Sequence, residues 1–478
     1  MQKILGSIML VAVLAVVMVA PAAAQAPGPG AWNVGFTLQN LSADQATVHI
    51  DFIKADGTSG GTWDGTIAGN GSQFLYSASI PLLQANSETA ATISSSTPLA
   101  AVANLASSSP KTEAAYSGID STEVNPVLFA PGVYKNYYSN TSNVRVQNTG
   151  ASKTCARVSF FAMGSSSAID TEVFDSPAGA GHTYTQADNA ALPGGFIGSA
   201  KVESLGAGTA GCGADTVAGQ GLAAIVNIVI APGPSVGNPS TLGLFGSYNA
   251  IISGGSVAYA PVLANKYFNN NSSLTILNLR SAPQWVRVTY GDGSVKEKQL
   301  GANSSQLWYT PNEGPAVGWF GGGKAACVTG PGGSVITDCE IVGTINQINT
   351  AGGFASYNAF KSGAGTVRLP IVNRLYSTTY GGYTTSVTCQ NIGSVTTNVS
   401  LALTGGMTVP SVTGVGPNGT AFWYLNKATY TGVTPGFNGS ATATASAAGA
   451  QIVCIGQQNG ETPPTPGDWL TTYNGINQ

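Results

Sequence analysis

The chain has 478 residues with 18 Lys and Arg, 21 Asp and Glu and a net charge of −3, so only 8% of its residues are charged. Globular proteins usually carry about 25% charged residues, and the lack of a basic excess excludes nucleic acid as a partner. Gly, Ser, Thr and Asn supply the polarity instead. Because a weakly charged surface associates readily, we expect the partners to be copies of the chain or cell-surface polysaccharide.

The first 24 residues have the pattern of a secretory signal peptide. Lys3 precedes the uncharged run 8–20, and Ala22-Ala-Ala24 stands before Gln25. A basic start, an apolar centre and small residues at the cleavage point are the marks of such a leader. An uncleaved membrane anchor is the alternative. We expect a mature chain that is secreted, has no membrane span, and is soluble or held on the cell surface.

A first β-sandwich module is expected over residues 25–120. The segment Val48-His-Ile-Asp-Phe52 alternates apolar and polar residues, which predicts a half-buried strand. A turn and the aromatic strand 72–76 follow, then an apolar strand ending on Asn104. The phrase Tyr116-Ser-Gly-Ile closes the module.

The same markers return in the same order over 121–252, 253–363 and 364–478. Each later copy opens with a Pro-led apolar segment, continues through an Asn turn, and ends on a Tyr-Asn phrase at intervals of about 110–130 residues, the size of a small domain. We expect core tyrosines whose hydroxyls bond nearby backbone, and amides at strand ends that act as caps. The recurring residues are Tyr116, Tyr248, Tyr357 and Tyr473, the turn residues Asn148, Asn278 and Asn391, and the amides Asn104, Asn227 and Asn346.

Short period-two strands bounded by Gly, Pro, Asn and Ser predict an all-β chain, a tandem array of about four β-sandwich modules. A β-propeller fits less well, because its blades span only about 40–50 residues. The order of repeated motifs over roughly residues 32–478 resembles the tandem immunoglobulin-like sandwich repeats of secreted bacterial surface proteins of the S-layer, stalk and adhesin type. The resemblance implies a non-enzymatic structural or adhesive protein, extended as a rod and able to self-assemble into a layer or filament.

Six cysteines fall in the three later modules, two in each, and none in the first. An even number of cysteines in an exported chain favours disulfides. Pairing of neighbours within a module is preferred among the fifteen connectivities. The expected pairs are Cys155 with Cys212, Cys327 with Cys339, and Cys389 with Cys454.

The sequence offers little for chemistry. Gly57-Thr-Ser-Gly-Gly61 has the form of a nucleophile elbow, but that motif needs a strand-to-helix turn. His49 and His182 have no converging carboxylates, and no Cys-X-X-Cys pair suggests a metal. We therefore expect no catalytic site, metal or cofactor. The acidic loop Gly291-Asp-Gly293 supplies one carboxylate, whereas calcium needs several oxygen ligands, and calcium between modules is the alternative.

Trp308 and Trp423 share one repeat position. The favoured interpretation places both in sandwich cores. The alternative is an exposed sugar platform, which would make the chain a secreted carbohydrate-binding protein.

Module one lacks the Pro-led first strand of the other three. An exposed sheet edge can accept a strand from another chain. One hypothesis is that residues 25–31, from this chain or a second copy, supply the missing strand. The alternative is that residues 32–40 pair within module one.

Overall fold

The chain was analysed as a computed structural model that describes residues 10–14, 32–76, 79–80, 89–108, 111–231, 243–350, 352–377, 382–461 and 468–478. In these residues nearly all regular elements are strands in antiparallel sheets. The helical elements described are the short α-helix α1 (Thr310–Glu313) and two single 3-10 turns, Ser121–Glu123 and Thr404–Gly406. The prediction of an all-β array of sandwich modules is therefore confirmed. Modules are numbered below by their predicted ranges, which themselves stay predictions.

The strands in and before module one form two sheets. They are β1 (Leu10–Leu14), β2 (Trp32–Asn40), β3 (Ala46–Lys54), β4 (Ser59–Ile67), β5 (Ser72–Tyr76), β6 (Thr89–Ser95), β7 (Leu99–Ser108), β8 (Lys111–Ser117) and β9 (Ile119–Asp120). One sheet has the order β4-β3-β6-β1-β9 and the other β5-β2-β7-β8.

Module two repeats this arrangement with sheets β13-β12-β15-β10 and β14-β11-β16-β17. Its strands are β10 (Val127–Lys135), β11 (Asn140–Asn148), β12 (Thr154–Ala162), β13 (Ala168–Ser176), β14 (Gly181–Thr185), β15 (Phe196–Leu205), β16 (Leu222–Ile230) and β17 (Leu244–Asn249).

Module three has the same neighbours, but its two sheets join through the pairing of β18 with β19. Its strands are β18 (Val257–Tyr267), β19 (Asn270–Asn278), β20 (Gln284–Tyr290), β21 (Val295–Leu300), β22 (Ser305–Tyr309), β23 (Trp319–Val328), β24 (Ile341–Asn349) and β25 (Phe354–Asn358).

Module four has sheets β29-β28-β31-β26-β34 and β30-β27-β32-β33. Its strands are β26 (Thr366–Arg374), β27 (Tyr383–Asn391), β28 (Thr397–Leu403), β29 (Thr408–Val415), β30 (Thr420–Tyr424), β31 (Phe437–Ala445), β32 (Ile452–Gly460), β33 (Leu470–Asn474) and β34 (Ile476–Asn477).

The repeated strand order differs from the immunoglobulin order. In immunoglobulin domains the first strand lies in a sheet of order ABED and the facing sheet is CFG. Here the first strand of each module pairs with the sixth, as β10 does with β15 and β26 with β31. The immunoglobulin-like part of the prediction is therefore corrected, because the same alternating pattern allows several strand orders.

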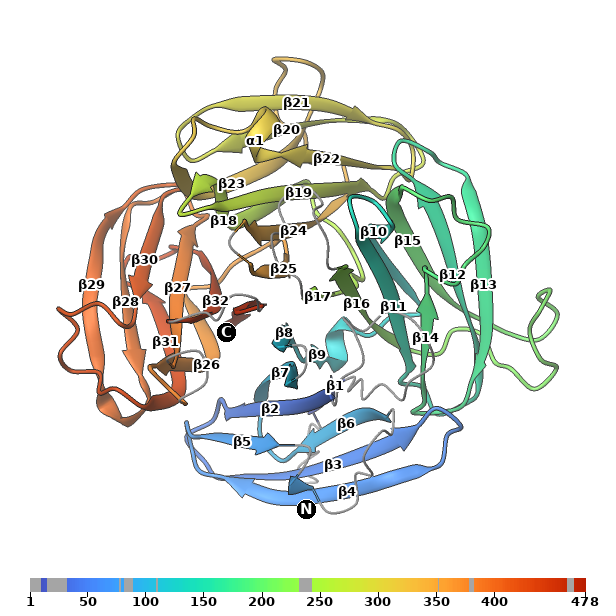
Figure 1. The fold of residues 1–478 in the computed structure, drawn as a ribbon, viewed down its shortest axis with the longest axis horizontal. Coiled ribbons are helices and arrows are strands. Elements are labelled where there is room, and N and C mark those ends of the chain that lie inside the picture. Colours follow the sequence, from blue (N-terminus) through green and yellow to red (C-terminus); the bar gives the residue numbers. More distant parts are fainter. Residues whose placement is uncertain are drawn as a thin grey trace, which may run out of the picture.

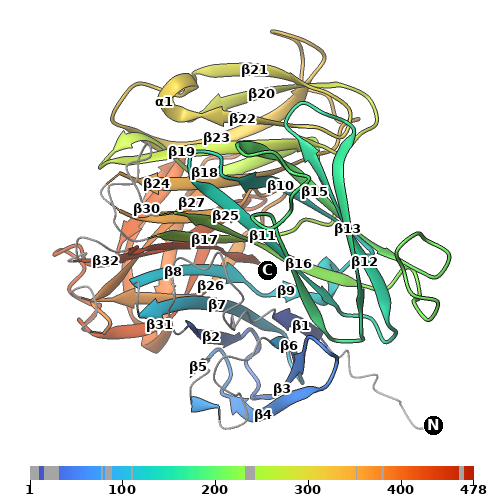
Figure 2. The ribbon, with the colours of Figure 1, turned by 45° about the vertical axis from the view of Figure 1, so that its right-hand side comes forward.

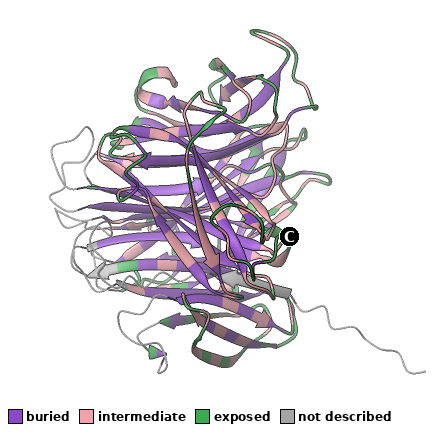
Figure 3. Cartoon of the chain, turned by 90° about the vertical axis from the view of Figure 1, so that its right-hand side faces the viewer, coloured by how far each residue is buried: buried purple, intermediate pink, exposed green. Residues whose placement is uncertain are grey.

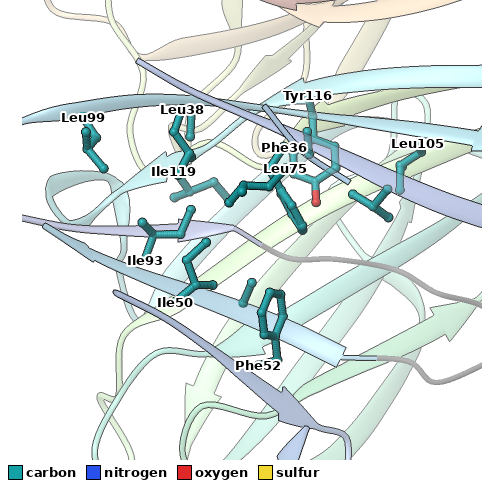
Figure 4. Packing of buried hydrophobic residues seen from close by; sticks show 14 of the residues in the cluster. Phe36, Leu38, Ile50, Phe52, Leu75, Ile93, Leu99, Leu105, Tyr116 and Ile119 are labelled. Carbon is teal, nitrogen blue, oxygen red and sulfur yellow. The ribbon is translucent and has the colours of Figure 1, made fainter. Parts of the chain in front are cut away.

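Each module closes its own apolar core between its two sheets. The strand β28 shows the expected alternation of buried and exposed residues along Thr397–Leu403. In module one, Phe36 and Leu38 from β2 face Ile50 and Phe52 from β3, with all four side chains fully buried (Figure 4).

The modules form a closed ring and not a rod. The strands β8, β17, β25 and β33 lie side by side at its centre (Figures 1 and 2). The cores are also joined in a cycle, because each cluster takes in buried residues of a neighbouring module. Ile225 of module two packs into the core of module one, Phe354 of module three into that of module two, Ile455 of module four into that of module three, and Val102 of module one into that of module four.

The expectation of an extended rod is therefore wrong. The strand β16, which pairs with β17, is buried along its whole length, so neither of its faces is open to solvent. Figure 3 shows the same burial through the middle of the molecule, with exposed residues confined to its outside and loops. Burial of a second sheet face against the neighbouring module stabilises ring closure through the hydrophobic effect.

Candidate functional site

The recurring Tyr-Asn phrase builds a hydrogen-bonded ring at the ends of the four central strands. Asn249 Nδ2 donates to Ser117 O at 2.9 Å, and Asn358 Nδ2 donates to Asn249 O at 2.6 Å. Asn474 Nδ2 donates to Asn358 O at 2.8 Å, and Ser117 Oγ closes the ring on Asn474 O at 2.8 Å. The second residue of each phrase thus joins one module to the next.

The tyrosines of the phrase point back into their own modules. Tyr248 Oη donates to Gly132 O at 2.7 Å and accepts from Gly132 N–H at 3.1 Å. Tyr357 bonds both backbone groups of Val262 in the same way, and Tyr473 donates to Ile371 O. In each case the partner is the residue after the proline of the first strand, where the ladder register shifts. These tyrosines lock the first strand in place.

The turn asparagines share one local role. Asn148 Nδ2 donates to Ser152 O at 2.8 Å, while its Oδ1 accepts from Gly150 N–H at 3.0 Å. Asn278 and Asn391 make the equivalent bonds four and two residues ahead. An Asn that holds its own turn in this way is structural.

The amides expected to cap strand ends lie elsewhere. Asn227 Oδ1 accepts from Ser247 Oγ at 2.6 Å, and Asn346 Oδ1 accepts from Ser356 Oγ at 2.8 Å. Asn104 Nδ2 reaches Gln458 of module four at 3.3 Å. All three lie within strands, so the capping role is wrong. Asn227 and Asn346 bond the central strands β17 and β25, and Asn104 bonds β32 of module four.

Buried carboxyl groups lie where the central strands begin. Asp468 is fully buried and accepts the N–H groups of Phe245 at 2.6 Å and Phe354 at 3.0 Å, which joins module four to modules two and three. Desolvation raises its pKa well above the ordinary value, and the nearby Glu113 charge adds to this. Burial also raises the pKa of Glu113 to about 8, partly opposed by a hydrogen bond from Tyr383.

A cavity of about 600 Å³ lies at the opposite end of the axis, where the central strands finish, and all four modules line it. Charged side chains that line it make hydrogen bonds to neighbouring residues. The Glu123 carboxylate accepts the Asp120 N–H at 3.3 Å, and Lys361 Nζ donates to Ser253 Oγ at 2.7 Å. Burial raises the pKa of Glu123.

Aromatic side chains gather at the hairpin tips between the first two strands of modules two, three and four. We call these segments, residues 136–139, 266–269 and 375–377, the tip face. Each tip adjoins the end of the strand that precedes a central strand. Ala231 N–H, just after β16, donates to Ser139 O, and Thr350 N–H, just after β24, donates to Asn269 O, both at 3.0 Å. Glu461 N–H, just after β32, donates at 3.0 Å to Gly382 O, next to Tyr383, whose backbone pairs with that of Tyr376. All three tips therefore lie at the same end of the ring.

The tip face exposes rings that a soluble domain usually buries. Tyr138 is 61% exposed, Phe268 77% and Tyr376 38%. Tyr138 and Phe268 also hold positive φ angles of 46° and 44°. The left-handed conformation costs a non-glycine residue about 1–2 kcal/mol, and such outliers cluster at functional positions.

Sequence reasoning missed the tip face, although a signal was present. Two adjacent aromatic residues stand at or just after the end of the first strand in two copies, Tyr137-Tyr138 and Tyr267-Phe268, and Tyr376 follows the strand in the third. Their rings meet edge to face, with centroids 4.8 Å and 4.7 Å apart in the two pairs.

Trp308 and Trp423 are both fully buried. They belong to the cores of modules three and four, in strands β22 and β30. A sugar platform at these residues is therefore wrong, because neither ring has a face open to a ligand. Both tryptophans lie where the favoured interpretation placed them, in the sandwich cores.

The six cysteines form three disulfides within modules. They join Cys155 to Cys212, Cys327 to Cys339, and Cys389 to Cys454. Each joins neighbours in the sequence, and an oxidising compartment is where such bonds persist.

His, Cys, Asp and Glu side chains are the groups from which a metal site or acid–base chemistry would be built. Among the described residues, no group of three or more His, Cys, Asp and Glu side chains lies close enough to hold a metal ion. The expectation that no carboxylates converge on His49 is wrong, because its ring nitrogens contact Asp64 at 2.7 Å and Asp51 at 3.2 Å on an exposed strand. His182 stacks on Phe174 with centroids 3.7 Å apart, and burial lowers its pKa to about 4. In the described part of the chain, no helix is long and apolar enough to cross a membrane.

Comparison with known proteins gives no family. No protein-family model and no curated protein matches the chain. Among solved structures, the tetra-tandem repeat in the extending region of a large adhesion protein has 13% identity and a TM-score of 0.10, covering 98% of this chain and 99% of that one. The BSP domain of a biofilm associated protein has 7% identity and a TM-score of 0.14, covering 94% and 91%. A deletion mutant of Bacillus subtilis oxalate decarboxylase has 9% identity and a TM-score of 0.15, covering 52% and 68%. Similarity at this level shows nothing about function.

Proposed function

We propose that this chain is an exported, non-enzymatic surface protein that adheres through its tip face. The observation that carries the proposal is the repetition of exposed aromatic rings at equivalent hairpin tips, all at one end of the ring. Exposed apolar groups gathered on one face mark interaction sites. The ring fixes the spacing of the tips, so one molecule can engage a surface at several points.

Three further observations support a surface location. The leader pattern over residues 1–24 indicates export. Three disulfides favour an oxidising compartment. The low charge and the buried polar bonds of the core suit a structural protein that packs against other copies, as in a surface layer.

Immunogold microscopy of the intact producing cell tests the location. We expect label on the outer surface without permeabilisation, and ordered arrays there if the protein forms a layer. Label that appears only after the envelope is opened would contradict the proposal.

Removal of the aromatic rings of the tip face tests whether the tip face mediates adhesion. A chain with Tyr138→Ser, Phe268→Ser and Tyr376→Ser should lose at least tenfold in adhesion of coated beads to the producing cells. The matched control replaces three exposed valines at the opposite end of the modules, Val217→Ser, Val335→Ser and Val395→Ser. Equal adhesion of the tip variant and the control would reject the role of the tip face.

A carbohydrate ligand is the second candidate, and the exposed tip tyrosines favour it. Aromatic rings present apolar faces that can stack on sugar rings, and Tyr138 adds a hydroxyl at an exposed position. Binding to a glycan array that disappears in the tip variant and persists in the control would establish this candidate. Adhesion to protein-coated surfaces alone, with no glycan bound, would favour the general adhesive role.

A further inference from the structure

The first-strand position of module one is filled by the leader. In module four, β26 lies between β31 and β34, with Arg368 opposite Thr442 and Ile476. In module one, β1 lies between β6 and β9, with Val13 opposite Thr92 and Ile119. The two registers are the same, because Ile119 and Ile476 each follow the module's tyrosine by three residues.

β1 occupies only part of the first-strand position of module one. β1 ends at Leu14, whereas β10, β18 and β26 continue past a proline and a shift of register. The residue after that proline receives the tyrosine hydroxyl in all three later modules. Module one has the tyrosine but no matching proline in β1.

Tyr116 shows what is missing. Its side chain is 2% exposed and lies among Phe36, Leu75 and Leu105 (Figure 4). Its hydroxyl has no hydrogen-bond partner among the described residues, unlike those of Tyr248, Tyr357 and Tyr473. A buried hydroxyl without a partner is unfavourable, so the position is built for a strand that presents a carbonyl to it.

Removal of residues 1–24 would take β1 away and leave the edge of β6 beside an apolar floor that contains Ile93 and Ile119. An unpaired strand edge next to buried apolar surface accepts a further strand readily. We propose that module one of the processed chain is a strand acceptor, filled in trans by an apolar strand that carries a proline at its centre.

The three first strands already present define the chemistry of this partner. Their sequences are Val-Leu-Phe-Ala-Pro-Gly-Val-Tyr-Lys, Val-Ala-Tyr-Ala-Pro-Val-Leu-Ala-Asn-Lys-Tyr and Thr-Val-Arg-Leu-Pro-Ile-Val-Asn-Arg. Each has four apolar or mixed residues, a proline, and an apolar stretch. The mature tail Gln25-Ala-Pro-Gly-Pro-Gly-Ala31, which lies outside the described residues, has no such apolar stretch, so we assign the position to a partner chain.

The probe is the β26 peptide, Thr366–Arg374, whose two arginines keep it soluble. We expect a fluorescent form of this peptide to bind saturably to the chain beginning at Gln25, measured by anisotropy, and not to the full chain, where β1 fills the position. Full-length protein with Val13→Pro, which disrupts β1, should regain binding. A scrambled peptide with the proline at its first residue should not bind.

Tyr116→Phe should weaken binding of the β26 peptide to the processed chain about tenfold, since one buried hydrogen bond is lost. Tyr248→Phe is the matched control, because its partner strand lies in the same module, and it should leave the affinity unchanged. Circular dichroism checks that both variants fold.

Absence of saturable binding to the folded processed chain, or equal binding to the full chain, would overturn the proposal. Insensitivity to Tyr116→Phe would also overturn it. Assembly of the processed chain with itself, abolished by excess peptide, would identify a second copy as the donor. The measurements use purified protein, so their failure leaves surface location and adhesion to be judged separately.

Discussion

Single residues decide how the four modules hold together. Asn358 and Asn474 each bond two backbone groups of the neighbouring module: Asn358 donates to Asn249 O at 2.6 Å and accepts from Asn249 N–H at 3.0 Å, and Asn474 does the same with Asn358 at 2.8 Å and 3.0 Å. Asn249 makes one bond of this kind, to Ser117 O at 2.9 Å. These bonds cross a module boundary, so the same side chain stabilises two modules at once.

Replacing Asn358 should therefore destabilise the ring. We expect Asn358→Ala to lower the free energy of unfolding by about 1–3 kcal/mol, since partly buried backbone groups of Asn249 lose their partner. Urea unfolding followed by tryptophan fluorescence measures this. The exposed Asn438→Ala is the control and should change stability by less than about 0.5 kcal/mol. Equal effects of the two substitutions would contradict the role of Asn358.

The buried carboxyl groups make stability depend on pH. Burial raises the folded-state pKa of Glu113 to about 8, from an ordinary value of about 4.5. The folded state then binds more protons than the unfolded state between these values, so its stability is greatest below about pH 4.5 from this group and falls as pH rises towards 8. Asp468 shifts in the same direction.

Glu113→Gln tests this dependence. We expect the wild-type chain to lose about 3–5 kcal/mol of unfolding free energy from this group between pH 5 and 8 as an upper bound, and the variant to lose less. Urea titrations at the two pH values give the difference. An exposed acid, Asp188→Asn, serves as control. A variant with the wild-type pH profile would show that Glu113 is not the group responsible.

At the scale of elements, the first strand and the tyrosine act as one unit. The bulge after the proline turns a backbone N–H and carbonyl towards the tyrosine hydroxyl in modules two and three. Module one keeps the tyrosine while its β1 supplies no such bulge. We therefore expect the tyrosine hydroxyl to contribute to the free energy of unfolding in modules two and three but not in module one.

Matched Tyr→Phe substitutions should reveal this difference. Tyr248→Phe leaves Gly132 without its partner and should cost about 1–3 kcal/mol. Tyr116→Phe removes an unpartnered hydroxyl and should be neutral or slightly stabilising. Differential scanning calorimetry of the two purified variants measures both. A large loss in the Tyr116 variant would mean that its hydroxyl has a partner.

At the scale of the whole molecule, ring closure sets the shape. Each core includes residues of a neighbouring module, and Asp468 joins three modules at the beginnings of the central strands. A chain held in this way should scatter as one compact particle.

Small-angle X-ray scattering of the chain tests the closed shape. For a compact chain of this length we expect a radius of gyration of about 23 Å. Four sandwiches in a row would give a much larger value and a distance distribution with a long tail. A profile of that extended kind at low concentration would contradict the ring, whereas a larger compact particle would indicate assembly.

The sequence by itself determined the class of fold and much of its local structure. Alternation along segments such as Thr397–Leu403 predicts which side of a strand is buried, and Asn148 predicts its own turn, since both depend on neighbours in the chain. The disulfide pairing also joins neighbours. The uninterrupted apolar run Leu222–Ile230 carried a further signal, because a strand of that kind is buried on both faces.

Only the tertiary structure decided what covers the second face of a sheet, the face turned away from its own module's core. A period-two pattern shows that a face is apolar but not which module packs on it, so it could not distinguish a rod from a ring. The burial of Trp308, the exposure of Tyr138 and the pairing of β1 with β6 likewise depend on residues far apart in the sequence. Packing between segments that are distant in the sequence determines which of these residues are buried and which strands pair, and the local sequence pattern carries no information about that packing.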